Sequence, residues 1–212
     1  MEELAPLANL TQLPSASMIR KNGKPADNLM VDLREIHQMI LFSMCLVLAF
    51  KDVLSFKNKW DGALNFSCRS PTEFIDAIVS FHHNHYEDRR YELHCGTALK
   101  QEKDINCHWT GYVNDFDHAV HYRCPGAGYI NGMASYHHNA YEDRRHRFRC
   151  CGPRSLNYQY KECRWTGWVN NYDQPVVYFV PKGHVLRGVN SVHHNHYEDR
   201  RFQFEVCKLV KK

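Results

Sequence analysis

The sequence predicts an all-β protein that consists of three repeats of about 55 residues, and three observations support this. One phrase occurs three times, with copies that begin 55 and 56 residues apart, and apolar and polar residues alternate before each copy. Alternation with a period of two is typical of strands, and no long helical periodicity occurs after residue 56. The copies read Phe81-His-His-Asn-His-Tyr-Glu-Asp-Arg-Arg90, Tyr136-His-His-Asn-Ala-Tyr-Glu-Asp-Arg-Arg145 and Val192-His-His-Asn-His-Tyr-Glu-Asp-Arg-Arg201.

We expect the repeats at 57–106, 107–162 and 163–212. Each repeat would open with a turn around a tryptophan, at Trp60-Asp-Gly, Trp109-Thr-Gly and Trp165-Thr-Gly. A first strand would follow, with alternate side chains directed inward because successive residues of a strand face opposite sides. The inward residues would be Leu64, Phe66 and Cys68, then Val120, Tyr122 and Cys124, then Val176, Tyr178 and Val180.

A second and a third strand would complete each repeat. The second strand has apolar pairs at Ile75 and Ile78, at Ile130 and Met133, and at Leu186 and Val189. A small residue at Ala77, Gly132 and Gly188 indicates a close approach of two backbones. The third strand follows the double arginine, with Leu93, Phe148 and Phe204 as its apolar anchors. Three or four strands per repeat fit a pseudo-threefold β-prism or β-trefoil; the sequence does not choose between them, and we prefer the prism.

The first 56 residues have the pattern of a leader. The apolar run at 39–50 is too short to span a bilayer comfortably and is typical of a signal peptide, which we place at 39–56. An uncleaved signal anchor or a buried strand is the alternative. Residues 1–38 would be an extension of the gene model or a disordered leader. Secretion agrees with the sequon at Asn65, a candidate N-glycosylation site within the first predicted strand.

Eight of the nine cysteines follow this leader, an even number that predicts a disulfide framework. Alignment of the repeats separates them into two classes. Cys68 and Cys95 correspond to Cys124 and Cys150 and are both replaced by valine in the third repeat, whereas Cys107 and Cys151 correspond to Cys163 and Cys207 and are absent from the first. Cysteines that are gained and lost together are most simply bonded together. We therefore predict the bonds Cys68–Cys95, Cys124–Cys150, Cys107–Cys151 and Cys163–Cys207.

The repeated phrase has two interpretations. Its aspartates and arginines could form ion pairs that tie neighbouring repeats together, because arginine matches a carboxylate with two parallel donors. Alternatively, the phrase displays hydrogen-bonding groups to a ligand at three places. The candidate ligand-binding residues are then His83, His85, Tyr86, Asp88, Arg89, His138, Tyr141, Asp143, Arg144, His194, His196, Tyr197, Asp199 and Arg200.

Several function classes are disfavoured. No serine nucleophile elbow, phosphate-binding loop or H-E-x-x-H motif occurs, so we expect no enzyme and no cofactor. Adjacent histidines of an extended segment face opposite sides, and no C-x-x-C pattern occurs, so we expect no metal site. The formal net charge of +4 is spread evenly, unlike the basic stripe of a nucleic-acid-binding protein.

Residues 57–212 resemble the dermatopontin family. The resemblance rests on the recurring Asp-Arg-x-aromatic/apolar-x-aromatic-x-Cys pattern, on the double cysteine Cys150-Cys151 and on Tyr-x-Cys-Pro at residues 122–125. The residues of the phrase resemble those of invertebrate members more closely than those of the vertebrate matrix protein. The invertebrate members include haemagglutinins, amebocyte aggregation factors and a hydrozoan cytotoxin. Arg-Gly-Asp and the acidic, tyrosine-rich N-terminal stretch of the vertebrate members are absent.

The resemblance implies a secreted, non-enzymatic protein of the extracellular space or matrix that binds glycans or cell surfaces multivalently and agglutinates cells. A structural matrix component that binds collagen, proteoglycans or glycosaminoglycans is the alternative, and a cytotoxin is ranked lower. We expect no nucleic-acid partner and no membrane span, and we allow for a homo-oligomer.

Overall fold

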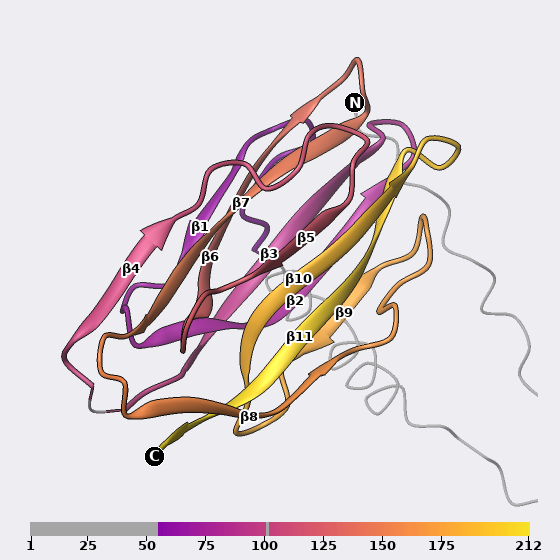
Figure 1. Ribbon diagram of the computed structural model, residues 1–212. Helices are drawn as coiled ribbons and strands as arrows, with labels where there is room; N and C mark the ends of the chain where they lie inside the picture. Colours follow the sequence, from indigo (N-terminus) through magenta and orange to yellow (C-terminus); the bar gives the residue numbers. More distant parts are fainter. Residues whose placement is uncertain (1–54, 101) are drawn as a thin grey trace, which may run out of the picture. The chain divides into compact units, whose positions relative to one another are not determined.

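The computed structural model describes residues 55–100 and 102–212, so the predicted leader at 1–38 and nearly all of the predicted signal peptide at 39–56 lie outside the described residues. The described part contains strands and no helix, which confirms the all-β class (Figure 1). It therefore holds no helix that could cross a membrane. The strands are β1 (Leu64–Ser67), β2 (Glu73–His83), β3 (Asp88–Thr97), β4 (Ile105–Trp109), β5 (Val120–Arg123), β6 (Tyr129–His138), β7 (Asp143–Pro153), β8 (Tyr158–Trp165), β9 (Val176–Phe179), β10 (Val185–His194) and β11 (Asp199–Lys211).

Three antiparallel hairpins, β2–β3, β6–β7 and β10–β11, form the centres of three sheets. Each hairpin takes its edge strand from another repeat. Strand β1 of the first repeat pairs with β6, β5 of the second pairs with β10, and β9 of the third pairs with β2. The exchange of edge strands is therefore cyclic: the first repeat gives a strand to the second, the second to the third, and the third to the first. Each repeat thus forms backbone hydrogen bonds with the next. Strands β4 and β8 extend two of the sheets by pairing with β7 and β11.

The predicted inward residues face the core. Each of the short strands β1, β5 and β9 has the same burial pattern, with its first residue buried and its third half-buried. The apolar pairs and anchors predicted for the second and third strands are buried in every repeat. The repeats thus share one core instead of each forming its own.

The small residues of the second strands lie where the exchanged edge strands pair with them. A Cβ atom added at Gly132 would lie 2.8 Å from the carbonyl oxygen of Phe66, and one at Gly188 would lie 2.9 Å from that of Tyr122. A register shift precedes both glycines and Ala77. The predicted close approach of two backbones is therefore present, and its cause is the edge strand that another repeat supplies.

All four predicted disulfides are present, namely Cys68–Cys95, Cys107–Cys151, Cys124–Cys150 and Cys163–Cys207. The bonds span 26 to 44 residues of sequence. Loops of this length are worth on the order of 3–4 kcal/mol each in the chain-entropy treatment. Two of the bonds hold β4 against β7 and β8 against β11, and thus secure the outer strands.

The predicted equivalence of Trp60 with Trp109 and Trp165 is wrong. Asn58, which lies two residues before Trp60, accepts a hydrogen bond from the backbone N–H of Tyr91 and donates one to the carbonyl of Arg89. Asn114 and Asn170 make the corresponding bonds in the other repeats. The equivalents of Trp60 are therefore Phe116 and Tyr172. The turn that precedes each phrase contains an aromatic residue whose type differs between the repeats. Residue type therefore paired Trp60 with the tryptophans Trp109 and Trp165, although its structural equivalents are Phe116 and Tyr172.

Candidate functional site

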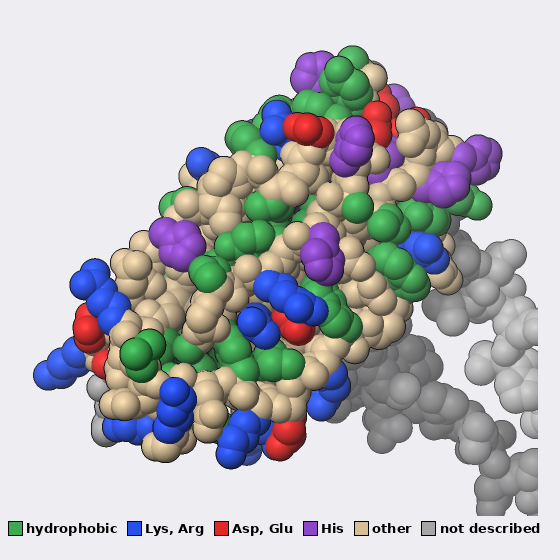
Figure 2. Space-filling view, viewed as in Figure 1, with side chains coloured by type: hydrophobic (Ala, Val, Ile, Leu, Met, Phe, Trp, Pro, Cys, Tyr) green, Lys and Arg blue, Asp and Glu red, His purple; other side chains and the backbone are tan. Residues whose placement is uncertain are grey.

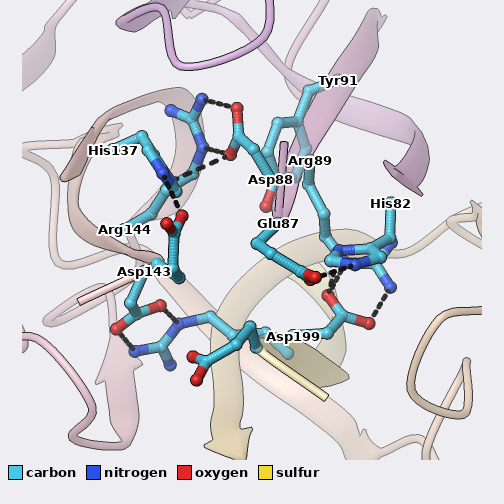
Figure 3. A pocket seen from close by; sticks show the side chains of 12 residues that line it. His82, Glu87, Asp88, Arg89, Tyr91, His137, Asp143, Arg144 and Asp199 are labelled. Atoms are coloured by element: carbon cyan, nitrogen blue, oxygen red, sulfur yellow. Dashed lines mark hydrogen bonds and ion pairs between the residues drawn. The ribbon is translucent and has the colours of Figure 1, made fainter. Parts of the chain in front are cut away.

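Each third strand begins with an aspartate followed by an arginine, and these six residues are buried together. Their side chains are at most 4% exposed. Arg144 donates two parallel hydrogen bonds to Asp88, from Nε at 2.6 Å and from Nη2 at 2.7 Å. Arg200 holds Asp143 in the same way, and Arg89 holds Asp199. We call this set the aspartate–arginine ring (Figure 3).

Each pair of the ring joins two repeats, and the three pairs close a circle. This confirms the interpretation in which the phrase ties neighbouring repeats together. The Nη2 group of each arginine also donates to a backbone carbonyl, that of Gln174, Gly62 or His118. Each aspartate also accepts a backbone N–H, from Asp61, Asp117 or Asp173. Buried charges are tolerated when they are paired and hydrogen-bonded in this manner.

The environment of the ring stabilises the ionised carboxylates. Burial alone would raise the pKa of Asp88, but hydrogen bonds from His137 and Arg144 lower the pKa to about 2. Burial would likewise raise the pKa of Asp143 and of Asp199, but the histidine and arginine paired with each one outweigh it, so both pKa values are lowered. The ring therefore remains charged over the whole physiological range of pH.

One histidine of each phrase accompanies the ring. The side chains of His82, His137 and His193 are at most 1% exposed. Nδ1 of each lies 3.3–3.4 Å from a ring aspartate, namely Asp199, Asp88 and Asp143 respectively. Burial lowers the pKa of these imidazoles, but the aspartate beside each one raises it above the usual value.

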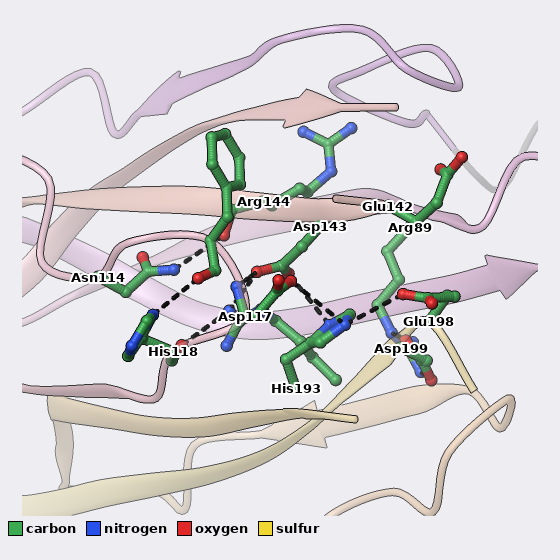
Figure 4. A network of polar contacts seen from close by, with 12 residues as sticks. Arg89, Asn114, Asp117, His118, Glu142, Asp143, Arg144, His193, Glu198 and Asp199 are labelled. Carbon is green, nitrogen blue, oxygen red and sulfur yellow. Dashed lines mark hydrogen bonds and ion pairs between the residues drawn. The ribbon is translucent and has the colours of Figure 1, made fainter. Parts of the chain in front are cut away.

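The second nitrogen of each histidine faces two more carboxylates. Nε2 of His193 lies 3.2 Å from Glu198 and 3.7 Å from Asp117 (Figure 4). His82 lies between Glu87 and Asp173, and His137 lies between Glu142 and Asp61, at matching distances. We call these three groups the acid–histidine clusters.

The two outer acids of each cluster have unusual backbone conformations. Asp61, Glu87, Asp117, Glu142, Asp173 and Glu198 all have positive φ, between 42° and 63°. Residues other than glycine seldom adopt this region, and glutamate has no local hydrogen bond that favours it. Of the seven non-glycine residues with positive φ in the described part of the chain, six belong to these clusters. Backbone strain is therefore concentrated around the three buried histidines.

The middle of each phrase, at residues 83–86, 138–141 and 194–197, is exposed instead. Its tyrosine stacks on the aromatic residue of the preceding turn, in the pairs Trp60 with Tyr86, Phe116 with Tyr141, and Tyr172 with Tyr197. The ring centroids are 4.7–5.4 Å apart and the planes are within 9° of parallel. We call these pairs the aromatic platforms.

The second arginine of each phrase extends the platform beyond the partner ring. Arg90 lies 4.9 Å from the ring of Trp60 and 4.0 Å from that of Phe56. Arg201 lies in the same way between Tyr172 and Trp168. Arg145 lies between Phe116 and Tyr112, so each repeat has a column in which a cation separates aromatic rings. The tyrosine of the phrase stands at one end of each column and is 37–48% exposed, and the rings at the other end of two columns, Tyr112 and Trp168, are 45% and 40% exposed.

Histidines border each platform. His83, His138 and His194 lie 5.1–5.3 Å from the tyrosine of their own phrase. His85 and His196 contact the tyrosine edge-on in the first and third repeats. Ala140 occupies this position in the second repeat, so its platform has one histidine fewer. All five histidines are exposed.

The three platforms lie at the same end of the described domain. The turns of the hairpins β2–β3, β6–β7 and β10–β11 lie together at the upper right of Figure 1. Figure 2 shows histidines at this end. The predicted site residues are thus in two places: the histidine and tyrosine members are on the surface, and the aspartate and arginine members are beneath them.

Sequence reasoning missed five kinds of residue at this site: the platform partners Trp60, Phe116 and Tyr172, the stacked arginines Arg90, Arg145 and Arg201, the outer aspartates Asp61, Asp117 and Asp173, the buried histidines His82, His137 and His193, and the glutamates Glu87, Glu142 and Glu198. The sequence does contain a signal for the platform partners and the outer aspartates. The segments 58–61, 114–117 and 170–173 share the pattern Asn-x-aromatic-Asp, which recurs with the period of the phrase.

The sequence is similar to those of several known proteins. The dermatopontin family profile matches residues 58–211. The chain is 44% identical to the hemagglutinin/amebocyte aggregation factor of Limulus polyphemus, over 81% of this chain and 94% of the relative. It is 37% identical to Millepora cytotoxin-1 of Millepora dichotoma, over 73% and 67% of the two chains. It is 34% identical to dermatopontin of Biomphalaria glabrata, over 68% and 93%. No solved structure matches the chain.

Proposed function

The chain belongs to the dermatopontin family, and from this premise we propose that it is a secreted, non-enzymatic adhesion protein that binds cell-surface glycans through its three aromatic platforms and agglutinates cells. The single observation that carries the proposal is the triple, exposed stack of tyrosine on an aromatic partner at one end of the domain. Four disulfides support secretion, because such bonds persist in oxidising compartments.

The chemistry of a platform suits a sugar. An aromatic ring offers an apolar face on which the C–H face of a pyranose can pack, and a phenolic hydroxyl that can hydrogen-bond to it. The histidines at the border supply further donors and acceptors for the hydroxyl groups. The arginine stacked on the partner ring holds that ring in place, so binding costs little side-chain entropy.

Three such platforms would make the protein multivalent. We infer that the repeats are arranged about an approximate threefold axis, because the three ring pairs and the three strand exchanges correspond one to one. A weak single contact becomes strong when several are made at once, provided that the geometry lets them engage together. Agglutination further requires that sites on one protein, or on an oligomer of it, reach two cells.

Agglutination of red cells by the full, disulfide-intact chain tests this function. We expect agglutination that simple sugars inhibit. Replacing an outer tyrosine by alanine should cost about 1–2 kcal/mol per site, the usual size for an aromatic hot spot. The single variants Tyr86→Ala, Tyr141→Ala and Tyr197→Ala should therefore agglutinate weakly, and the triple variant should not agglutinate.

Leu156→Ala is the matched control, because Leu156 is 86% exposed and lies in the β7–β8 loop, away from the platforms. It should agglutinate like the unmodified chain. Full activity of a folded triple tyrosine variant would contradict the proposed function.

A second function is favoured by the opposite end of the domain. Figure 2 shows lysines and arginines gathered at the lower left. The loops there are joined by hydrogen bonds from Arg154 N–H to the carbonyl of Asp104 and from Lys212 N–H to that of Asn157, with exposed Lys103 adjacent. This basic end could bind glycosaminoglycans in a matrix role. Such binding should weaken steeply as salt is raised, whereas sugar-inhibited agglutination should not. Retention on heparin that Lys103→Gln and Arg154→Gln reduce would support it.

A further inference from the structure

We propose that each acid–histidine cluster is a binding site for a divalent transition cation of the zinc type, so that the chain holds three ions between its repeats. The ligands would be Nε2 of the buried histidine, the glutamate of the same phrase and the outer aspartate of another repeat. The three sets are His82, Glu87 and Asp173; His137, Glu142 and Asp61; and His193, Glu198 and Asp117.

Two of the three separations that a shared ion requires, those from Nε2 to each of the two carboxylate oxygens, are in the range for one small ion. Nε2 lies 3.2–3.3 Å from the glutamate oxygen and 3.7–3.8 Å from the aspartate oxygen in all three clusters. Tetrahedral zinc with bonds of about 2.0–2.2 Å separates its ligand atoms by about 3.3–3.6 Å. The glutamate and aspartate oxygens are farther from each other than from Nε2, so these partly exposed carboxylates would rotate toward each other to complete three coordination positions, and water could supply the fourth.

The buried histidine points to a ligand independently of the acids. In the first cluster the side chain is 1% exposed, and both ring nitrogens of His82 lie 3.3 Å from a carboxylate without forming a well-aligned hydrogen bond, whereas Nε2 of His137 and of His193 is hydrogen-bonded to the glutamate at 3.2 Å. Oδ1 of Asp173, 3.7 Å from Nε2 of His82, also lacks a hydrogen-bond partner. Buried polar atoms without partners are costly and call for an explanation. An ion at this place would satisfy both atoms at once.

The ring aspartate completes a recognised arrangement around a metal. Nδ1 of His82 lies 3.3 Å from Asp199, on the opposite side of the imidazole from Glu87 and Asp173. Histidines that bind metals usually donate their other N–H to a carboxylate, which fixes the tautomer and leaves Nε2 free for the ion. The same relation holds for His137 with Asp88 and for His193 with Asp143.

The charges in each cluster also match a divalent ion. The first cluster and its ring pair contain three carboxylates, Glu87, Asp173 and Asp199, against the single guanidinium of Arg89. With a neutral histidine this leaves two negative charges, which one divalent cation would balance. The outer acids are 30–35% exposed, so an ion can reach the site from solvent. One nitrogen and two carboxylate oxygens suit zinc better than calcium, which prefers six to eight oxygen ligands.

Calorimetric titration of the full, chelator-treated chain with zinc chloride at neutral pH tests the proposal. We expect close to three ions per chain, a count confirmed by elemental analysis after dialysis. Glu87→Gln, Glu142→Gln and Glu198→Gln each remove one ligand but keep the size of the side chain and the aspartate–arginine ring. Each should reduce the number of tight sites by one, with at least a tenfold loss of affinity at the altered site.

Glu162→Gln is the matched control, because Glu162 also has a positive φ but lies on β8 and pairs with Lys208. It should keep all three sites. Disulfide mapping and circular dichroism would show that each variant is folded, and the single variants decide the question if the triple variant does not fold. The absence of tight zinc binding by the unmodified chain would overturn the proposal. Binding that all three glutamine variants leave unchanged would overturn it as well, since the ions would then lie on the surface histidines.

Discussion

The turn at 83–86 and the strand start at 88–89 are neighbours in the sequence, but they lie in opposite environments. His83 and Tyr86 are exposed, whereas Asp88 and Arg89 are 3% exposed. The change occurs at Glu87, whose positive φ turns the chain from the hairpin loop into the core. One short phrase thus supplies both a surface and the buried pairs beneath it, and mutations in its two halves should have different consequences.

The difference is energetic as well as geometric. A buried ion pair adds little stability by itself, but the removal of one partner leaves an uncompensated charge. A side chain on an exposed turn can be replaced at almost no cost to stability. The buried half should therefore govern folding, and the exposed half should govern binding.

The largest effect is expected from breaking one pair of the ring. Arg144→Ala should lower the free energy of unfolding by about 3–5 kcal/mol, because Asp88 would stay buried without its partner. Arg144 also donates to Ser135 and to the carbonyl of Gly62, and these acceptors would lose their donor. Denaturant unfolding of the full chain with its disulfides intact measures this loss.

The adjacent arginine provides the control. Arg145 is partly exposed and lies against Tyr112 and Phe116, so Arg145→Ala should cost about 1 kcal/mol or less. Equal losses for the two variants would show that the ring is not the element that holds the repeats together.

The sequence predicted the strands, the disulfides and the pairing of aspartate with arginine, since each depends on a pattern that recurs with the repeat. It did not predict which repeat supplies each edge strand, because β1 and β6 are far apart in sequence and only the closed exchange brings them together. Considering one loop at a time also hid the acid–histidine clusters, in which the outer aspartate comes from another repeat. Trp60 was misaligned because Phe116 and Tyr172 differ from it in residue type.

The second effect concerns a position at which the three repeats differ. Tyr91, His146 and Phe202 occupy equivalent places beneath the ring, each two residues after its arginine. Both ring nitrogens of His146 are buried without partners. Burial, aided by the charge of Arg200, lowers the pKa of His146 to about 3. His146→Phe should therefore raise the free energy of unfolding by about 1–2 kcal/mol, because unsatisfied polar atoms are removed.

The dependence of this gain on pH follows from the sign of the shift. Above the ordinary histidine pKa of about 6.5, the folded and unfolded states both hold His146 neutral. As the pH falls below that value, the unfolded state binds a proton that the folded state refuses, so the unmodified chain loses stability. The advantage of His146→Phe should grow as the pH is lowered from 7 to 5. A constant or shrinking advantage over this range would show that His146 is not held neutral.

The smallest effect is expected on the surface of the second repeat, where Ala140 stands in place of His85 and His196. Ala140 is exposed at the hairpin turn, so Ala140→His should change the free energy of unfolding by less than about 0.5 kcal/mol. If histidines at the border of a platform contact the ligand, the variant should agglutinate at a lower concentration than the unmodified chain, and His85→Ala and His196→Ala should require a higher one. Unchanged agglutination in all three variants would restrict recognition to the stacked tyrosines, because the platforms would then bind equally well with one bordering histidine or two.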